Sequence, residues 1–130
     1  YLAMKKALEL GNLRPEDISY INAHGTGTPN NDLSEGIAIE RLFTDRVPLV
    51  SSTKSFTGHT LGAAGGIEAV LSVLAITEKI VYPNLRFKTK MKELTFSPVT
   101  DRIKGININN VLSNSFGFGG NNTCLIFSKN

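Results

Sequence analysis

The spacing of apolar residues in the first half of the chain predicts one helix followed by two strands. Apolar positions recur at helical spacing over residues 2–8, and Gly11-Asn12 is typical of a helix C-terminus. Short apolar runs over 18–23 and 47–51 are bounded by turn residues, which is the pattern of buried strands. The chain opens at Tyr1, already inside the helical pattern, so we expect a fragment whose preceding part is missing.

A second helix is expected between the two strands. Asp32-Leu33-Ser34-Glu35 resembles a capping box, in which Asp32 accepts from first-turn amides and Glu35 reaches back. The apolar positions that follow fall mostly on one face: Leu33, Ile37, Ala38, Ile39, Leu42 and Phe43. Glu35, Glu40 and Arg41 are therefore expected to lie towards solvent.

The alternation of predicted helices and strands continues in the second half of the chain. Residues 61–76 are apolar all round apart from two polar positions, which predicts a helix buried within a larger body. Residues 85–105 have the alternating charge of an irregular surface segment. Strand pattern resumes over 106–115, and 123–128 is expected to pair with it as a hairpin. The order α-β-α-β-α-β-β predicts an α/β fold with a mixed sheet packed on the buried helix.

Composition agrees with a single globular domain. The 130 residues are 41% hydrophobic, enough for one core and too few for two ordinary domains. The net charge of +3 does not indicate nucleic-acid binding; the densest basic cluster suits a solvated face or an acidic partner protein, and comprises Arg86, Lys88, Lys90 and Lys92. The single cysteine, Cys124, excludes an intrachain disulfide and favours the cytoplasm, and no apolar run is long enough to predict membrane insertion.

The two histidines of the chain each follow a predicted strand. His24 enters the glycine-rich loop 25–28, and His59 closes the Ser/Thr-rich stretch 52–59. A glycine-rich turn at 117–120 follows a third strand, so three strand ends are expected to present loops to one place. Taken alone, each histidine is also compatible with a structural role in a hydrogen-bonded turn. The presence of both at strand ends favours a catalytic role.

Several side chains near these loops are candidates for chemical roles. We expect His59 near the N-terminus of the buried helix, whose dipole favours a neutral imidazole able to donate an N–H to a developing oxyanion. Lys54 is expected to pair with Glu68, the carboxylate of that helix. Phe118, between glycines, suits either a lid over an apolar tunnel or an ordinary hairpin turn. Cys124 alternates with apolar strand residues and is expected to be a core residue.

Three motifs together resemble the C-terminal half of the β-ketoacyl-acyl-carrier-protein synthases, condensing enzymes of the thiolase-like superfamily. They are Asn-Ala-His-Gly-Thr-Gly-Thr at 22–28, Ser-Thr-Lys-Ser-Phe-Thr-Gly-His at 52–59 and Asn-Ser-Phe-Gly-Phe-Gly-Gly at 114–120. The similarity covers residues 1–130 as one domain of a thiolase-like fold. It implies that His24 and His59 belong to a Cys-His-His triad that binds the malonyl thioester carbonyl and stabilises an enolate.

The resemblance also implies roles for other residues. Lys54 matches an active-site lysine that orders His59. The residues implied to bind the substrate and its phosphopantetheine arm are Thr26, Thr28, Phe116, Phe118, whose backbone N–H also helps form an oxyanion hole, and Gly119. A structural monovalent cation site is implied at Asn22, Glu68, Ser113 and Asn114. No other cofactor is expected, because the pantetheine arrives on the acyl carrier protein.

The function implied is decarboxylative Claisen condensation of malonyl-carrier protein with an acyl thioester, in fatty acid or related lipid or polyene biosynthesis, by a homodimer. The family's nucleophilic cysteine lies in the N-terminal half, so these residues alone should be inactive. One alternative is a non-catalytic chain-length-factor subunit, against which the two histidines and Lys54 argue. Another is a thiolase, which uses a different pattern of histidine and cysteine. The asparagines at 29–32 and 121–122 suit a specialised branch of the synthases.

Overall fold

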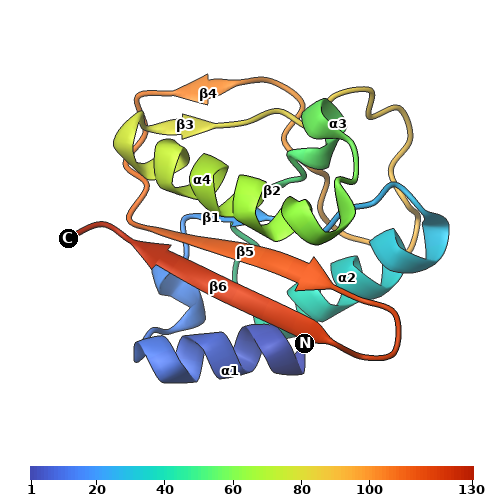
Figure 1. Cartoon of the computed structure of the whole chain (residues 1–130), viewed down its shortest axis with the longest axis horizontal. Coiled ribbons are helices and arrows are strands. Elements are labelled where there is room, and N and C mark those ends of the chain that lie inside the picture. Colours follow the sequence, from blue (N-terminus) through green and yellow to red (C-terminus); the bar gives the residue numbers. More distant parts are fainter.

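The computed structural model describes residues 1–130 as a mixed sheet with helices on both faces (Figure 1). The four-stranded sheet has the order β2-β1-β5-β6, in which β1 is parallel to both of its neighbours and β6 is antiparallel to β5. Its strands are β1 (Tyr20–Asn22), β2 (Leu49–Ser51), β5 (Asn110–Phe116) and β6 (Asn122–Ser128). A separate antiparallel pair is formed by β3 (Ile80–Val81) and β4 (Ile103–Lys104).

The helices divide between the two faces of the sheet. Helices α1 (Leu2–Gly11) and α2 (Pro29–Leu42) share a core with Ile21 and Leu112, whereas α4 (Ala64–Thr77) shares a second core with Tyr20 and Val111. Alternate residues of a strand point to opposite faces, so the two cores use alternate positions of β1 and β5. The shorter elements are α3 (Lys54–Thr57) and two 3₁₀ turns, Pro15–Asp17 and Leu61–Ala63.

The predicted fold class is confirmed, and three of the strands begin later in the chain than predicted. The predicted starts at residues 18, 47 and 106 move to Tyr20, Leu49 and Asn110. Pairing explains the difference: the register of the central strands begins where Tyr20 faces Leu49 on one side and Val111 on the other. The hairpin of β5 and β6 is confirmed, and segment 85–105 is irregular except at β4.

The start of the second helix was predicted wrongly. Helix α2 begins at Pro29, with Thr28 at its N-cap, and a proline is well suited to this first position. Asp32 therefore lies in the first turn, where its carboxylate accepts the N–H of Gly27 at 3.2 Å. Glu35 was expected in solvent but is only 5% exposed, because it faces buried backbone N–H groups.

Helix α4 is covered on one face only. Ala64, Glu68, Ser72 and Ala75 are buried, whereas Val70, Val73 and Leu74 are 60%, 43% and 40% exposed. Burial on all sides is thus not seen within these residues, and an apolar face remains open. None of the helices has both the length and the apolar character needed to span a membrane.

Candidate active site

The two histidine loops meet because their strands are neighbours. His24 follows β1 and the 52–59 loop follows β2, and parallel strands end at the same edge of a sheet. Gly25 has φ +41°, and a Cβ at this position would lie 2.5 Å from the Cβ of Ser52. The glycine after His24 is therefore needed for the two loops to approach each other.

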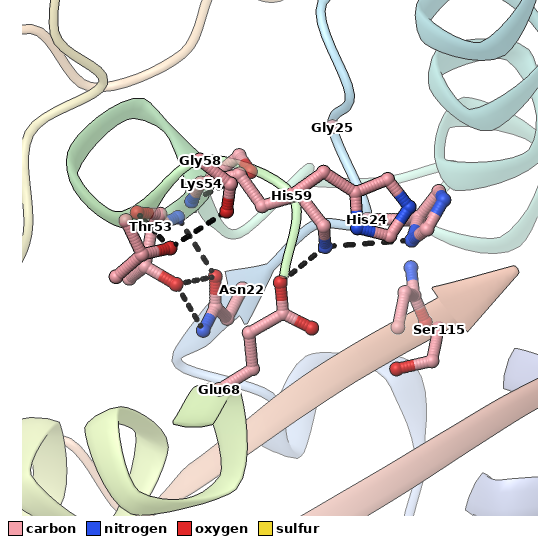
Figure 2. A network of polar contacts seen from close by, with 12 residues as sticks. Asn22, His24, Gly25, Thr53, Lys54, Gly58, His59, Glu68 and Ser115 are labelled. Atoms are coloured by element: carbon pink, nitrogen blue, oxygen red, sulfur yellow. Dashed lines mark hydrogen bonds and ion pairs between the residues drawn. The ribbon is translucent and has the colours of Figure 1, made fainter. Parts of the chain in front are cut away.

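The two imidazoles lie side by side at this edge (Figure 2). Their ring centroids are 5.4 Å apart and the rings are perpendicular. His24 is buried, whereas His59 is exposed. Phe116, the last residue of β5, is tilted against His24 with ring centroids 5.7 Å apart. The three expected strand ends are thus brought together, with one ring from each.

Hydrogen bonds determine the tautomers of both rings. The ammonium of Lys54 lies 3.4 Å from Nδ1 of His24, and because an ammonium can only donate, that nitrogen accepts. Nδ1 of His59 accepts the backbone N–H of Leu61 at 3.3 Å. In the neutral form each ring therefore carries its proton on Nε2. Each of the two neighbouring rings thus offers one N–H donor.

Burial keeps His24 uncharged. Burial, the positive charge of Lys54 and the neighbouring His59 together lower the pKa of His24 to about 4. The helix dipole acts on His59 less than expected, because α4 begins at Ala64 and a 3₁₀ turn intervenes. The hydrogen bond from the N–H of Leu61 orients the His59 ring.

Lys54 and Glu68 form the predicted buried ion pair. Lys54 begins the one-turn helix α3, and its ammonium contacts Oε1 of Glu68 on α4; both side chains are almost completely buried. Burial raises the pKa of Glu68, and the hydrogen bond and charge of Lys54 act in the opposite direction. The same ammonium reaches His24, whereas the resemblance implied that it orders His59. Lys54 thus links the carboxylate of α4 to the buried imidazole (Figure 2).

Asn22 holds the loop that carries Lys54. Its side-chain oxygen accepts both the backbone N–H and the hydroxyl of Thr53 at 3.2 Å, and its amide nitrogen donates to that hydroxyl at 3.1 Å. All of these atoms are buried, so water does not compete for them. The end of β1 is therefore attached to the start of α3.

Comparison with known proteins identifies this arrangement. Residues 1–88, which include both histidines, match the C-terminal domain of beta-ketoacyl synthase. The chain belongs to the β-ketoacyl synthase family. It is 43% identical over 129 residues to 3-oxoacyl-[acyl-carrier-protein] synthase 2 of Staphylococcus aureus (strain COL), covering 98% of this chain and 31% of the relative. The corresponding synthase of Synechocystis sp. is 46% identical over 129 residues, with the same coverage of both.

Solved structures of ketosynthases show the same fold. One chain in the structure of the ketosynthase ApeO in complex with its chain length factor ApeC, from Xenorhabdus doucetiae, matches with a TM-score of 0.88 and 40% identity, over 98% of this chain and 32% of that one. A beta-ketoacyl synthase from Burkholderia phymatum STM815 has a TM-score of 0.88 and 37% identity, over 98% and 31%. The chain thus spans about a third of the length of the synthases it matches.

Glu35 is a residue of this synthase domain that sequence reasoning missed. Its two carboxylate oxygens accept the backbone N–H groups of His24 and Gly25, each at 2.9 Å, and Asn114 donates to it at 3.0 Å. Burial raises the pKa of Glu35, and these three donors oppose the shift. Its helical spacing to Ile39 and Phe43, which are both buried, could have indicated that Glu35 lies on the buried face of the helix. Glu35 fixes the backbone on which the His24 ring stands.

The four residues of the implied cation site do not share one face. Asn22 and Ser113 are paired in register, and alternation along β5 places Ser113 on the α4 side with Glu68. Asn114 instead turns its side chain to Glu35 and Met4 on the other side. Oε2 of Glu68 is buried without a partner, an environment that fits a monovalent cation. Asn22, Glu68 and Ser113 are therefore the side chains that could hold one.

The residues expected to bind substrate lie in the loop after β1 and at the end of β5 and the turn that follows it. Thr26 and Thr28 lie in the loop that follows His24, and their hydroxyl oxygens are 3.3 Å apart. Phe118 lies at the tip of the β5–β6 turn with its ring fully exposed, and Gly119 beside it has φ +83°. Of the two predicted phenylalanines, only Phe116 contacts a catalytic candidate in this structure.

Proposed function

We propose that the full-length protein is a 3-oxoacyl-[acyl-carrier-protein] synthase, and that this chain supplies the site at which malonyl thioester loses carbon dioxide. The observation that carries the proposal is the pair of adjacent imidazoles whose Nδ1 atoms both accept hydrogen bonds. Two Nε2–H groups are thereby left for one developing oxyanion. Preorganised donors of this kind commonly supply a large part of the rate enhancement in enolate chemistry.

The proposed reaction proceeds in two steps. The bond between the malonyl carboxylate and the α-carbon breaks, carbon dioxide leaves, and the electron pair becomes an enolate whose oxygen accepts from His24 and His59. The α-carbon of the enolate then attacks an acyl thioester carried on a cysteine from outside these 130 residues. The thiolate of that cysteine is expelled, and the product is a 3-oxoacyl thioester on the carrier, longer by two carbons.

Other residues of the chain assist in this proposal. Lys54 stabilises the tautomer of His24 and disfavours its protonation, because its ammonium faces Nδ1. Thr26 and Thr28 offer hydroxyls to the amides of the pantetheine arm, which enters along the mouth of the loop. Phe118 and Gly119 form the adjacent turn, whose exposed ring can cover the bound acyl group.

The proposal extends to a bound cation, cofactors, cellular location and oligomeric state. A monovalent cation held by Asn22, Glu68 and Ser113 would contact Oε2 of Glu68, whose other oxygen contacts Lys54, and would supply no chemistry to the substrate. The reaction requires no redox cofactor, and the pantetheine is a part of the acyl carrier protein. We place the protein in the cytoplasm, as a homodimer that exchanges acyl and malonyl thioesters with that carrier.

The test is condensation by the purified full-length protein, supplied with malonyl- and acyl-carrier protein and followed by mass spectrometry of the carrier. The proposal predicts a 3-oxoacyl product from this protein alone. A chain-length-factor subunit is the alternative, favoured by the matched structure in which a ketosynthase is bound to its chain length factor. Product only when a separate ketosynthase is added would establish that alternative and contradict the proposal.

A further inference from the structure

The loop that carries Lys54 is held by a second segment that is distant in sequence. Three hydrogen bonds join residues 84–86, here called the clamp, to residues 52–55. The N–H of Ser52 donates to Oδ1 of Asn84 at 3.0 Å, and the N–H of Leu85 donates to Oγ of Ser55 at 3.1 Å. The guanidinium of Arg86 donates to the carbonyl oxygen of Ser55 at 2.9 Å.

The clamp is itself attached to the sheet. The N–H of Asn84 donates to the carbonyl of Val99 at 2.6 Å, and the N–H of Val99 donates to the carbonyl of Val50 in β2 at 2.8 Å. Val50 lies immediately before the loop that the clamp holds. The clamp is therefore anchored to the same strand end from which the 52–55 loop departs.

Arg86 adopts an unfavourable backbone conformation. Its φ is +61°, in the left-handed region that residues other than glycine and asparagine seldom occupy. Such a conformation persists only where surrounding contacts hold it, and here it directs the side chain to Ser55. The carbonyl it reaches belongs to Ser55, the second residue of the four-residue helix α3, which is too short to supply an intrahelical donor to it.

Helix α3 needs such external support. It has four residues, too few to be stable in isolation. The ammonium of its first residue, Lys54, must meet two partners on different elements, Oε1 of Glu68 and Nδ1 of His24. A small displacement of α3 would break the contact with His24, which is already 3.4 Å long.

We propose that Asn84 and Arg86 are positioning residues for the decarboxylation site, acting through the 52–55 loop to place the Lys54 ammonium against His24. The expected change in kcat rests on the proposed function, whereas the expected displacement of Lys54 from His24 rests on the structure alone. The hydrogen bonds of the clamp go to the 52–55 loop and to neither imidazole. We therefore expect the clamp to affect kcat and not KM.

The experiment measures decarboxylation of malonyl-carrier protein by the full-length synthase and three variants of Asn84 and Arg86. Asn84→Ala removes the acceptor for Ser52 and is expected to lower kcat roughly tenfold, since small misplacements of catalytic groups are costly. Asn84→Asp keeps an acceptor oxygen and is expected to keep kcat within about twofold. Arg86→Gly tolerates the positive φ but loses the guanidinium, and about a threefold loss is expected. KM should stay within about twofold in all of them.

The matched control is Lys88→Ala, which removes a positive charge two residues from Arg86 without a hydrogen bond to the 52–55 loop. Crystal structures of wild type and Asn84→Ala give the second readout, with the contact between Lys54 and His24 expected to be lost in the variant. The proposal is overturned if Asn84→Ala and Arg86→Gly match the control, if Asn84→Asp is as slow as Asn84→Ala, or if only KM changes. Inactive wild type would contradict the proposed function, and the crystallographic comparison would still decide on the clamp.

Discussion

At the scale of single residues, the site depends on buried polar side chains that have specific hydrogen-bond partners in the histidine loops. Glu35, Asn22 and Lys54 are almost completely buried, and each contacts a histidine loop. Removing one partner of such a group leaves the other without a hydrogen bond in a place that water does not reach. These residues therefore couple the stability of the fold to the geometry of the two imidazoles.

Glu35→Ala tests this coupling. The substitution leaves the N–H groups of His24 and Gly25 without acceptors, so we expect the free energy of unfolding to fall by about 2–3 kcal/mol. Urea unfolding of the full-length protein measures the loss. Glu9→Ala on α1 is the control, because Glu9 is exposed and the loss of its surface ion pairs with Lys5 and Lys6 should cost less than about 1 kcal/mol. Equal losses for the two variants would show that the backbone of the His24 loop does not depend on Glu35.

The lowered pKa of His24 predicts a pH dependence of stability. Between its ordinary pKa and about 4, the unfolded chain takes up a proton that the folded His24 does not. The free energy of unfolding should therefore fall as the pH falls through this window. His24→Gln should reduce this slope, as measured by urea unfolding at several pH values. The exposed His59→Gln variant serves as the control, and identical slopes for wild type and His24→Gln would contradict the assignment.

At the scale of elements, α4 presents two different surfaces. One holds Glu68 against the site, and the other leaves Val70, Val73 and Leu74 exposed in this chain. Apolar surface of this kind favours association. We expect the isolated 130-residue chain to self-associate through α4, and Val73→Glu with Leu74→Lys to shift it towards monomer in analytical ultracentrifugation. Thr77→Lys adds charge beside this surface and should change little; unchanged association in the double variant would place the contact elsewhere.

Some strands and contacts between elements could be predicted from the sequence, and others could not. Apolar runs predicted β1 and β2, because burial on both sides of a strand leaves a continuous hydrophobic pattern. The ion pair of Lys54 with Glu68 was predicted because an isolated carboxylate in an apolar helix needs a partner. The inward turn of Glu35 was missed, because its partners are backbone N–H groups of a distant loop. The hydrogen bonds of Asn84 and Arg86 with the 52–55 loop could not be predicted from local patterns either, since these contacts span about 30 residues.

At the scale of the whole molecule, the central claim is that both imidazoles hold one oxygen as carbon dioxide leaves. The measurement is malonyl-carrier decarboxylation by the full-length protein and its His24→Ala, His59→Ala and double variants. We predict that each single variant loses roughly 100-fold or more in kcat, and that the double variant is little slower, because residues that act as one unit are not additive. A single variant that keeps its rate within about threefold of wild type would contradict a shared oxyanion site.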